Sequence, residues 1–122
     1  MGVTFGFQGE VEMPVWSPDG AKSVTFRFAY TDQGPHRLEL VGAIPGTLWE
    51  VEGPGRIHRT GYWCNDVQAA SAHMLSRGLF LLAKVGVADG DEDASIVFFQ
   101  AGSGLYIELI SSETRAAMFG DG

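Results

Sequence analysis

The sequence feature that most constrains the fold is an internal repeat. Residues 28–41 and 97–110 align without gaps at an offset of 69 residues. Each copy has a β-prone segment with aromatic residues, a turn that contains glycine, and a segment of the form aliphatic-Glu-Leu-aliphatic, so that Glu39 aligns with Glu108. A repeat of this length indicates a fold built from duplicated supersecondary units. Each copy predicts a β-hairpin.

The segments before the second copy predict a strand, a helix and a further strand. Residues 56–64 are rich in β-forming residues. Residues 67–77 carry apolar side chains at helical spacing and follow Asn65 or Asp66, either of which is a suitable N-cap. Residues 79–87 predict the next strand. With the hairpin of the repeat, the order becomes strand, helix, strand, strand, strand.

This βαβββ order resembles the vicinal-oxygen-chelate superfamily, which contains glyoxalases, bleomycin resistance proteins and dioxygenases. Four short segments carry the resemblance in the same order as in its glyoxalase-like members: Pro45-Gly-Thr-Leu-Trp49, Ile57-His-Arg-Thr-Gly-Tyr-Trp63, Asn65-Asp-Val-Gln-Ala-Ala70 and Ile107-Glu-Leu109. The resemblance implies an α+β fold in which paired βαβββ modules form one cupped, mainly antiparallel sheet around a ligand cavity.

The resemblance also implies how the chain is organised. We expect a single domain over residues 1–122, divided into a partial first module, a linker, a complete βαβββ module and a tail at 1–44, 45–55, 56–112 and 113–122. The first module lacks its opening strand and helix and keeps three strands, at about 3–14, 22–30 and 35–42. The residues 22–30 support this, because apolar and polar side chains alternate along them.

In metal-binding members of the superfamily, ligands come from the first and last strands of each module. The resemblance therefore implies His58, Glu108 and Glu39 as ligands of a divalent metal, which could be Zn, Ni, Co, Mn or Fe. The counterpart of His58 in the first module would fall at position −11, before the chain begins. The chain is then part of a longer protein, or another subunit supplies the strand, or the metal site is vestigial. We favour a homo-oligomer, most simply a homodimer, because an open sheet edge invites pairing.

Two functions from different classes follow from this resemblance. The first is a metal-dependent isomerase, epimerase or lyase that acts on an oxygen-rich small molecule through a metal-stabilised enolate, with Glu108 as ligand or general base. Dioxygenase chemistry is a weaker variant of it. We expect Arg37, Tyr62 and Tyr106 to bind the substrate.

The second is a metal-free protein that binds or sequesters a small molecule, as the resistance proteins of the superfamily do. The missing ligand strand favours the binder, and Glu at the ligand position of both repeats favours the enzyme. Both carboxylates could also be ordinary strand residues, and His58 could be held by a backbone carbonyl. An accessory interaction domain is a third possibility without specific support.

Composition excludes several other classes. The formal net charge is −7 and the eight basic residues are scattered, which argues against nucleic acid as a partner. No apolar stretch reaches the length of a signal peptide core or a membrane span. Cys64 is the single cysteine, so no intrachain disulfide can form. A reducing compartment fits, and we expect a cytoplasmic protein with no membrane partner.

Overall fold

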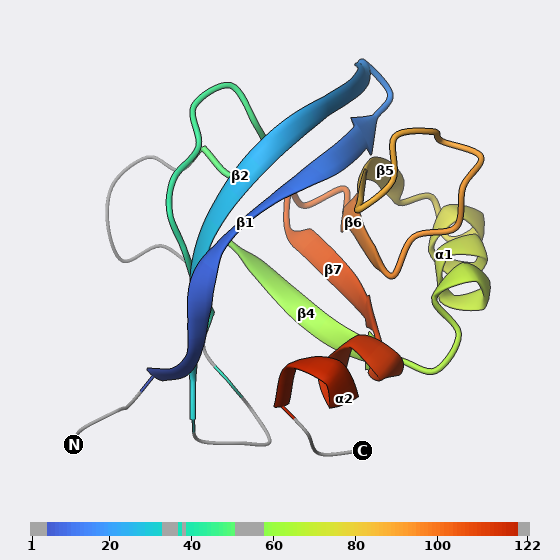
Figure 1. The fold of residues 1–122 in the computed structure, drawn as a ribbon. Coiled ribbons are helices and arrows are strands. Elements are labelled where there is room, and N and C mark those ends of the chain that lie inside the picture. The colour runs from blue at the N-terminus through green and yellow to red at the C-terminus, as the bar shows by residue number, and fades with distance from the viewer. Residues whose placement is uncertain (1–4, 33–36, 38, 51–57, 120–122) are drawn as a thin grey trace. The chain divides into compact units, whose positions relative to one another are not determined.

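The computed structural model describes residues 5–32, 37, 39–50 and 58–119. Along the chain (Figure 1), the elements are β1 (Phe5–Ser17), β2 (Gly20–Thr31), β3 (Glu39–Val41), β4 (Arg59–Cys64), α1 (Val67–Ser76), β5 (Phe80–Val85), β6 (Ile96–Gln100), β7 (Tyr106–Ser111) and α2 (Ser112–Phe119). The strands hydrogen-bond in the order β3-β2-β1-β5-β6-β7-β4. β1 with β5, β2 with β3, β5 with β6 and β6 with β7 pair antiparallel, whereas β4 pairs parallel with β7. The predicted α+β class and mainly antiparallel sheet are confirmed.

Contacts within the chain group it into two compact units. Unit 1 comprises Met1–Glu12 and Thr25–Arg56, and unit 2 comprises Met13–Val24 and Ile57–Gly122. The long strands β1 and β2 therefore contribute one end to each unit. The expectation of one domain over residues 1–122 stays a prediction.

Unit 1 contains β3, the first part of β1 and the last part of β2, and these are the three strands predicted for the incomplete first module. β2 pairs with β3 antiparallel, with Tyr30 opposite Glu39. The ring of Trp49 packs edge-on against Phe26, with 4.6 Å between ring centroids, and Trp49 is 5% exposed. The turn before Trp49 is held by the Thr47 hydroxyl, which donates to the Ile44 carbonyl at 2.8 Å. The rest of the predicted linker, residues 51–55, lies outside the described residues.

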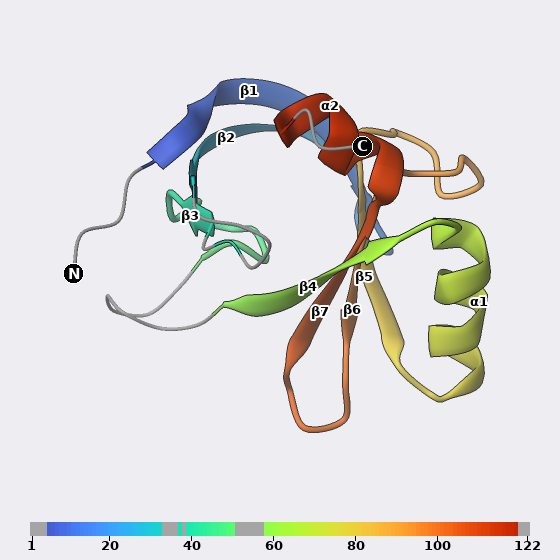
Figure 2. The same cartoon turned by 90° about the horizontal axis from the view of Figure 1, so that it is seen from below.

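Unit 2 contains the predicted βαβββ module. β5, β6 and β7 form an antiparallel meander, and β4 pairs with β7 on its far side (Figure 2). At the opposite end of this meander, the last part of β1 pairs antiparallel with β5, with Val15 opposite Val85. The sequence predicts this strand over residues 56–64, and among the described residues β4 begins at Arg59. Residues 56 and 57 lie outside the described residues. Among the described strands β3 and β4 end the order. Pairing of such an end strand with a second copy of the chain stays a prediction.

Helix α1 begins at an N-cap that the sequence predicts. Asp66 has extended backbone angles, and its carboxylate accepts a hydrogen bond from the Ala69 N–H at 3.0 Å. The helix ends before Gly78, which takes a positive φ of 84°. α1 covers the apolar face of the sheet, where the buried cluster comprises Val67, Ala94, Val97, Phe99 and Leu109.

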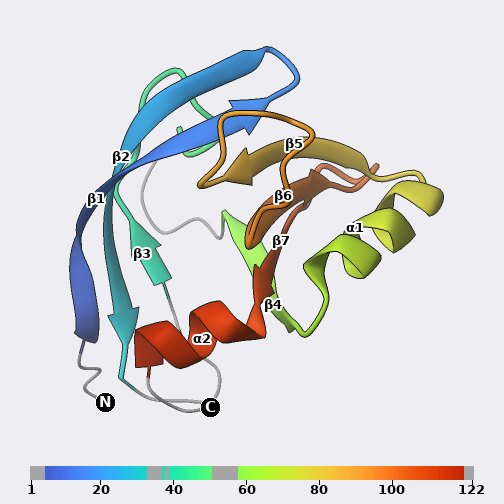
Figure 3. The ribbon, with the colours of Figure 1, turned by 45° about the vertical axis from the view of Figure 1, so that its right-hand side comes forward.

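Helix α2 lies on the other side of β4 and β7 from α1 (Figure 3). The ring of Phe119 stands edge-on to Trp63 at 6.1 Å, and the Arg115 guanidinium lies 5.9 Å from the centroid of the Trp63 ring system. The sequence predicts only a short helical turn here. Among the described residues, no helix is long and apolar enough to cross a membrane.

Candidate functional site

Glu108 lies in the middle of β7 and is 6% exposed, although it is charged. The register of the parallel pair places Gly61 beside Glu108, and that of the antiparallel pair places Phe98 beside it. Directly paired residues of neighbouring strands point to the same side of a sheet. Because side chains alternate along a strand, Arg59 and Tyr106 also belong to this side. We call this side of β4, β7 and β6 the Glu108 face.

Arg59 is the partner of the buried carboxylate. Its Nε donates a hydrogen bond to Glu108 Oε1 at 2.9 Å, and the two side chains are 10% and 8% exposed. The guanidinium carbon also lies 5.4 Å from the centroid of the Phe98 ring, within the range of a cation–π contact. Gly61 lies directly beside the pair, and a Cβ there would stand in ordinary van der Waals contact with Glu108 Oε1, at 3.4 Å. The charge of Glu108 is thus compensated by the chain itself.

His58 precedes β4 and approaches the same guanidinium. Its Nδ1 lies 3.2 Å from Arg59 Nη1, and its ring stands edge-on to Tyr106 with 5.1 Å between centroids. A guanidinium can only donate hydrogen bonds, so Nδ1 is the acceptor and the proton of the neutral imidazole sits on Nε2. The structure therefore brings together His58, Glu108 and Tyr106, around an arginine that the sequence analysis did not select.

The fit of this cluster to a metal ion can be judged from its donor atoms. Glu108 Oε1 and His58 Nδ1 both face Arg59, which carries a fixed positive charge. A second cation at the same place would be repelled. Over the described part of the chain, no three His, Cys, Asp or Glu side chains form a group that could hold a metal. As arranged here, His58 and Glu108 do not fit a metal ion.

The other residues selected from the sequence belong to other elements or to the other face of β4. Glu39 begins β3 in unit 1 and is half-buried, as is Arg37, which precedes that strand. In unit 2, Tyr62 is paired with Leu109 and therefore points to the side of the sheet opposite Glu108 and Tyr106. It is 53% exposed. Tyr62 and Tyr106 thus do not share one face.

Sequence reasoning missed Arg59 because it assigned the ligand position of the strand to its neighbour, His58. Both residues are polar, and alternation alone does not say which parity of β4 faces Glu108. The register with β7 decides it, since Arg59 pairs with Tyr106. Within β4, Gly61 pairs with Glu108, and Arg59 lies two residues before it on the same face.

Cys64 ends β4 on the side of α1. Burial raises the pKa of its thiol, and a backbone hydrogen bond with Ile110 acts in the opposite, lowering direction. Its Sγ donates to the Tyr62 carbonyl at 3.6 Å. A raised pKa disfavours the thiolate, which is the nucleophilic form. This environment makes Cys64 a poor nucleophile near neutral pH.

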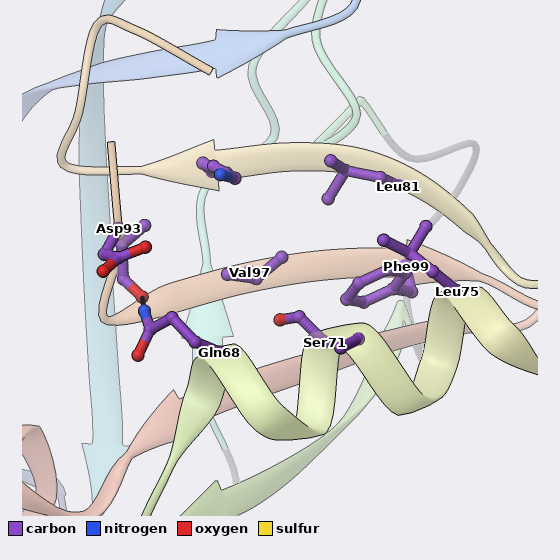
Figure 4. Close-up of a pocket in the computed structure, with 10 residues that line it drawn as sticks. Gln68, Ser71, Leu75, Leu81, Asp93, Val97 and Phe99 are labelled. Carbon is purple, nitrogen blue, oxygen red and sulfur yellow. Dashed lines mark hydrogen bonds between the residues drawn. The ribbon is translucent and has the colours of Figure 1, made fainter. Parts of the chain in front are cut away.

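Unit 2 also holds a pocket of about 260 Å³ between α1 and the sheet (Figure 4). Gln68, Ser71 and Leu75 line it from the helix, and Leu81, Val97 and Phe99 from β5 and β6. The Ser71 hydroxyl oxygen is buried without a hydrogen-bond partner among the described residues. This pocket is on the opposite side of the sheet from Glu108, and the sequence analysis did not predict it.

The family of the chain follows from comparison with known proteins. A sequence profile of the glyoxalase, bleomycin resistance protein and dioxygenase superfamily matches residues 1–98. The matched region covers most of the chain, so this protein belongs to that superfamily, as the resemblance of its motifs predicts. No curated protein and no solved structure matches the chain.

Proposed function

We propose that this chain is a metal-independent member of the superfamily that binds a small molecule. The observation that carries the proposal is the hydrogen-bonded ion pair of Arg59 with Glu108, at 2.9 Å and nearly removed from solvent. The carboxylate that would serve as a metal ligand is neutralised by a side chain of the same module. A charge-assisted bond of this length is among the stronger contacts that a protein makes.

Both units carry aromatic surface suited to a ligand of mixed polarity. On the Glu108 face, Tyr106 is half-buried and stands beside His58. In unit 1, Phe7 and Phe28 stack with 5.4 Å between ring centroids, and Tyr30 lies about as close to both rings. These three rings are only partly buried. Aromatic walls with a few fixed polar groups are typical of small-molecule sites.

The alternative is the metal-dependent isomerase, epimerase or lyase with His58, Glu108 and Glu39 as ligands. The deep burial of Glu108 favours it. In this reading Arg59 must release Glu108 before the carboxylate can bind a metal or act as a base. Arg37, Tyr62 and Tyr106 would then contact the substrate, and the identity of the metal would indicate the reaction.

The test compares ligand binding and metal content in the same preparation. The chain is purified without a metal-affinity tag, treated with EDTA and screened by ligand-observed NMR against small aromatic compounds, including cationic ones. We expect binding that persists in EDTA, weakens in Tyr106→Ala and is unchanged in Tyr62→Ala, the matched control on the opposite face. One equivalent of bound transition metal in the untreated protein, lost in His58→Ala, would overturn the proposal in favour of the enzyme.

A further inference from the structure

Position 59 is the place on β4 from which a side chain reaches Glu108. Of the strand residues on the Glu108 face, Gly61 has no side chain and Trp63 packs against α2. Arg59 alone among these three contacts the carboxylate, 49 residues away in sequence. Residue 59 therefore determines what the buried carboxylate meets on the first strand of the module.

The guanidinium occupies donor atoms that a metal would need. Nε holds Glu108 Oε1, and Nη1 lies against His58 Nδ1. With Nδ1 accepting from arginine and the proton on Nε2, neither nitrogen of a neutral imidazole has a lone pair to offer. A guanidinium has only N–H donors and carries a positive charge, so Arg59 cannot itself be a ligand and repels a cation from these atoms.

The geometry points to Arg59 as a built-in cation that takes the place of a metal ion and by itself keeps this module metal-free. The inference rests on the proposed metal-independent function and goes further, because it assigns that property to one side chain. Around Arg59 the module supplies a buried carboxylate and an imidazole, Glu108 and His58, which both contact the guanidinium. Replacing Arg59 by a ligand residue should therefore create a metal site.

The experiment uses the full chain in four forms: unchanged, Arg59→His, Arg59→Lys and the double variant Arg59→His with Glu108→Gln. Co²⁺ is the probe, because its visible absorption reports the ligands as well as the affinity. We expect Arg59→His to bind one Co²⁺ per chain, with affinity roughly tenfold or more above the unchanged protein. The Arg59→Lys variant keeps a cation and should stay without metal, and the double variant should lose the gain.

The outcomes separate this inference from the proposed function. If the unchanged chain binds Co²⁺ as tightly as Arg59→His, both fail. If the unchanged chain binds none and Arg59→His, with native circular dichroism, gains nothing, the role of Arg59 is wrong and the metal-independent function stands. Should Arg59→His unfold without metal, Co²⁺ must restore its native circular dichroism, and failure to do so also overturns the inference.

Discussion

The two faces of β7 stabilise their buried side chains in different ways. Glu108 and Leu109 are neighbours in sequence and are 6% and 2% exposed. Leu109 packs in the apolar cluster beneath α1, and Glu108 is held by Arg59 on the opposite face. Burial of an apolar side chain is favourable by itself, whereas a charge can be buried only with a partner. The comparison shows that the apolar face needs no specific partner for burial, whereas the Glu108 face depends on Arg59.

The largest expected effect on stability comes from placing a new charge on the apolar face of β7. Leu109→Glu places a carboxylate in the apolar cluster, whose described members offer no cation. We expect a loss of roughly 5 kcal/mol or more in the free energy of unfolding, which approaches the whole stability of a small domain. Urea unfolding followed by circular dichroism measures it. Leu109→Met, the matched control, should lose less than about 1.5 kcal/mol.

The next largest effect on stability comes from removing one or both charges of the ion pair. Glu108→Ala leaves the Arg59 guanidinium buried without its carboxylate, and we expect about 3–5 kcal/mol of lost stability. The double variant Arg59→Leu with Glu108→Leu removes both charges and should be more stable than Glu108→Ala. The same urea experiment tests this. A double variant no more stable than Glu108→Ala would show that the pair contributes more than mutual charge compensation.

The smallest effect concerns reactivity on the α1 side. Because the pKa of the Cys64 thiol is raised, its thiolate fraction at pH 8 is lower than that of an ordinary cysteine. Alkylation by iodoacetamide should therefore be slower in the folded protein than in urea, and its rate should keep rising with pH beyond the range usual for cysteine. By linkage, the stability that the protonated thiol contributes is present below its unfolded pKa and is lost as pH rises through the raised folded pKa. Equal rates in folded and unfolded protein would contradict this.

Much of the fold could be predicted because the repeat and the turn residues are local signals. The alternation along residues 22–30 and the N-cap at Asp66 indicated the right elements. Their ends were less predictable: β3 has only three residues, and α2 is longer than the predicted turn. Strand ends depend on pairing with distant residues, which the local sequence does not encode.

The site was predicted only in part, for a related reason. Glu108 was selected through its alignment with Glu39, and its burial is consistent with a special role. Arg59 was missed because the register of β4 against β7 joins residues 49 positions apart, and a shift by one residue exchanges the faces of a strand. The pocket beneath α1 depends on how the helix lies over β6, which periodicity does not specify.

The parallel pairing of β4 with β7 also sets an order of events during folding. β4 is the first strand of its module and is hydrogen-bonded to the last, so it stays unpaired on the ribosome until residues 106–111 have been made. The antiparallel meander of β5, β6 and β7 is joined by short connections and can form first, since closing a short loop loses less entropy. The bond of Arg59 with Glu108 needs β4 paired with β7, so the carboxylate is shielded from water only in a module that contains both strands.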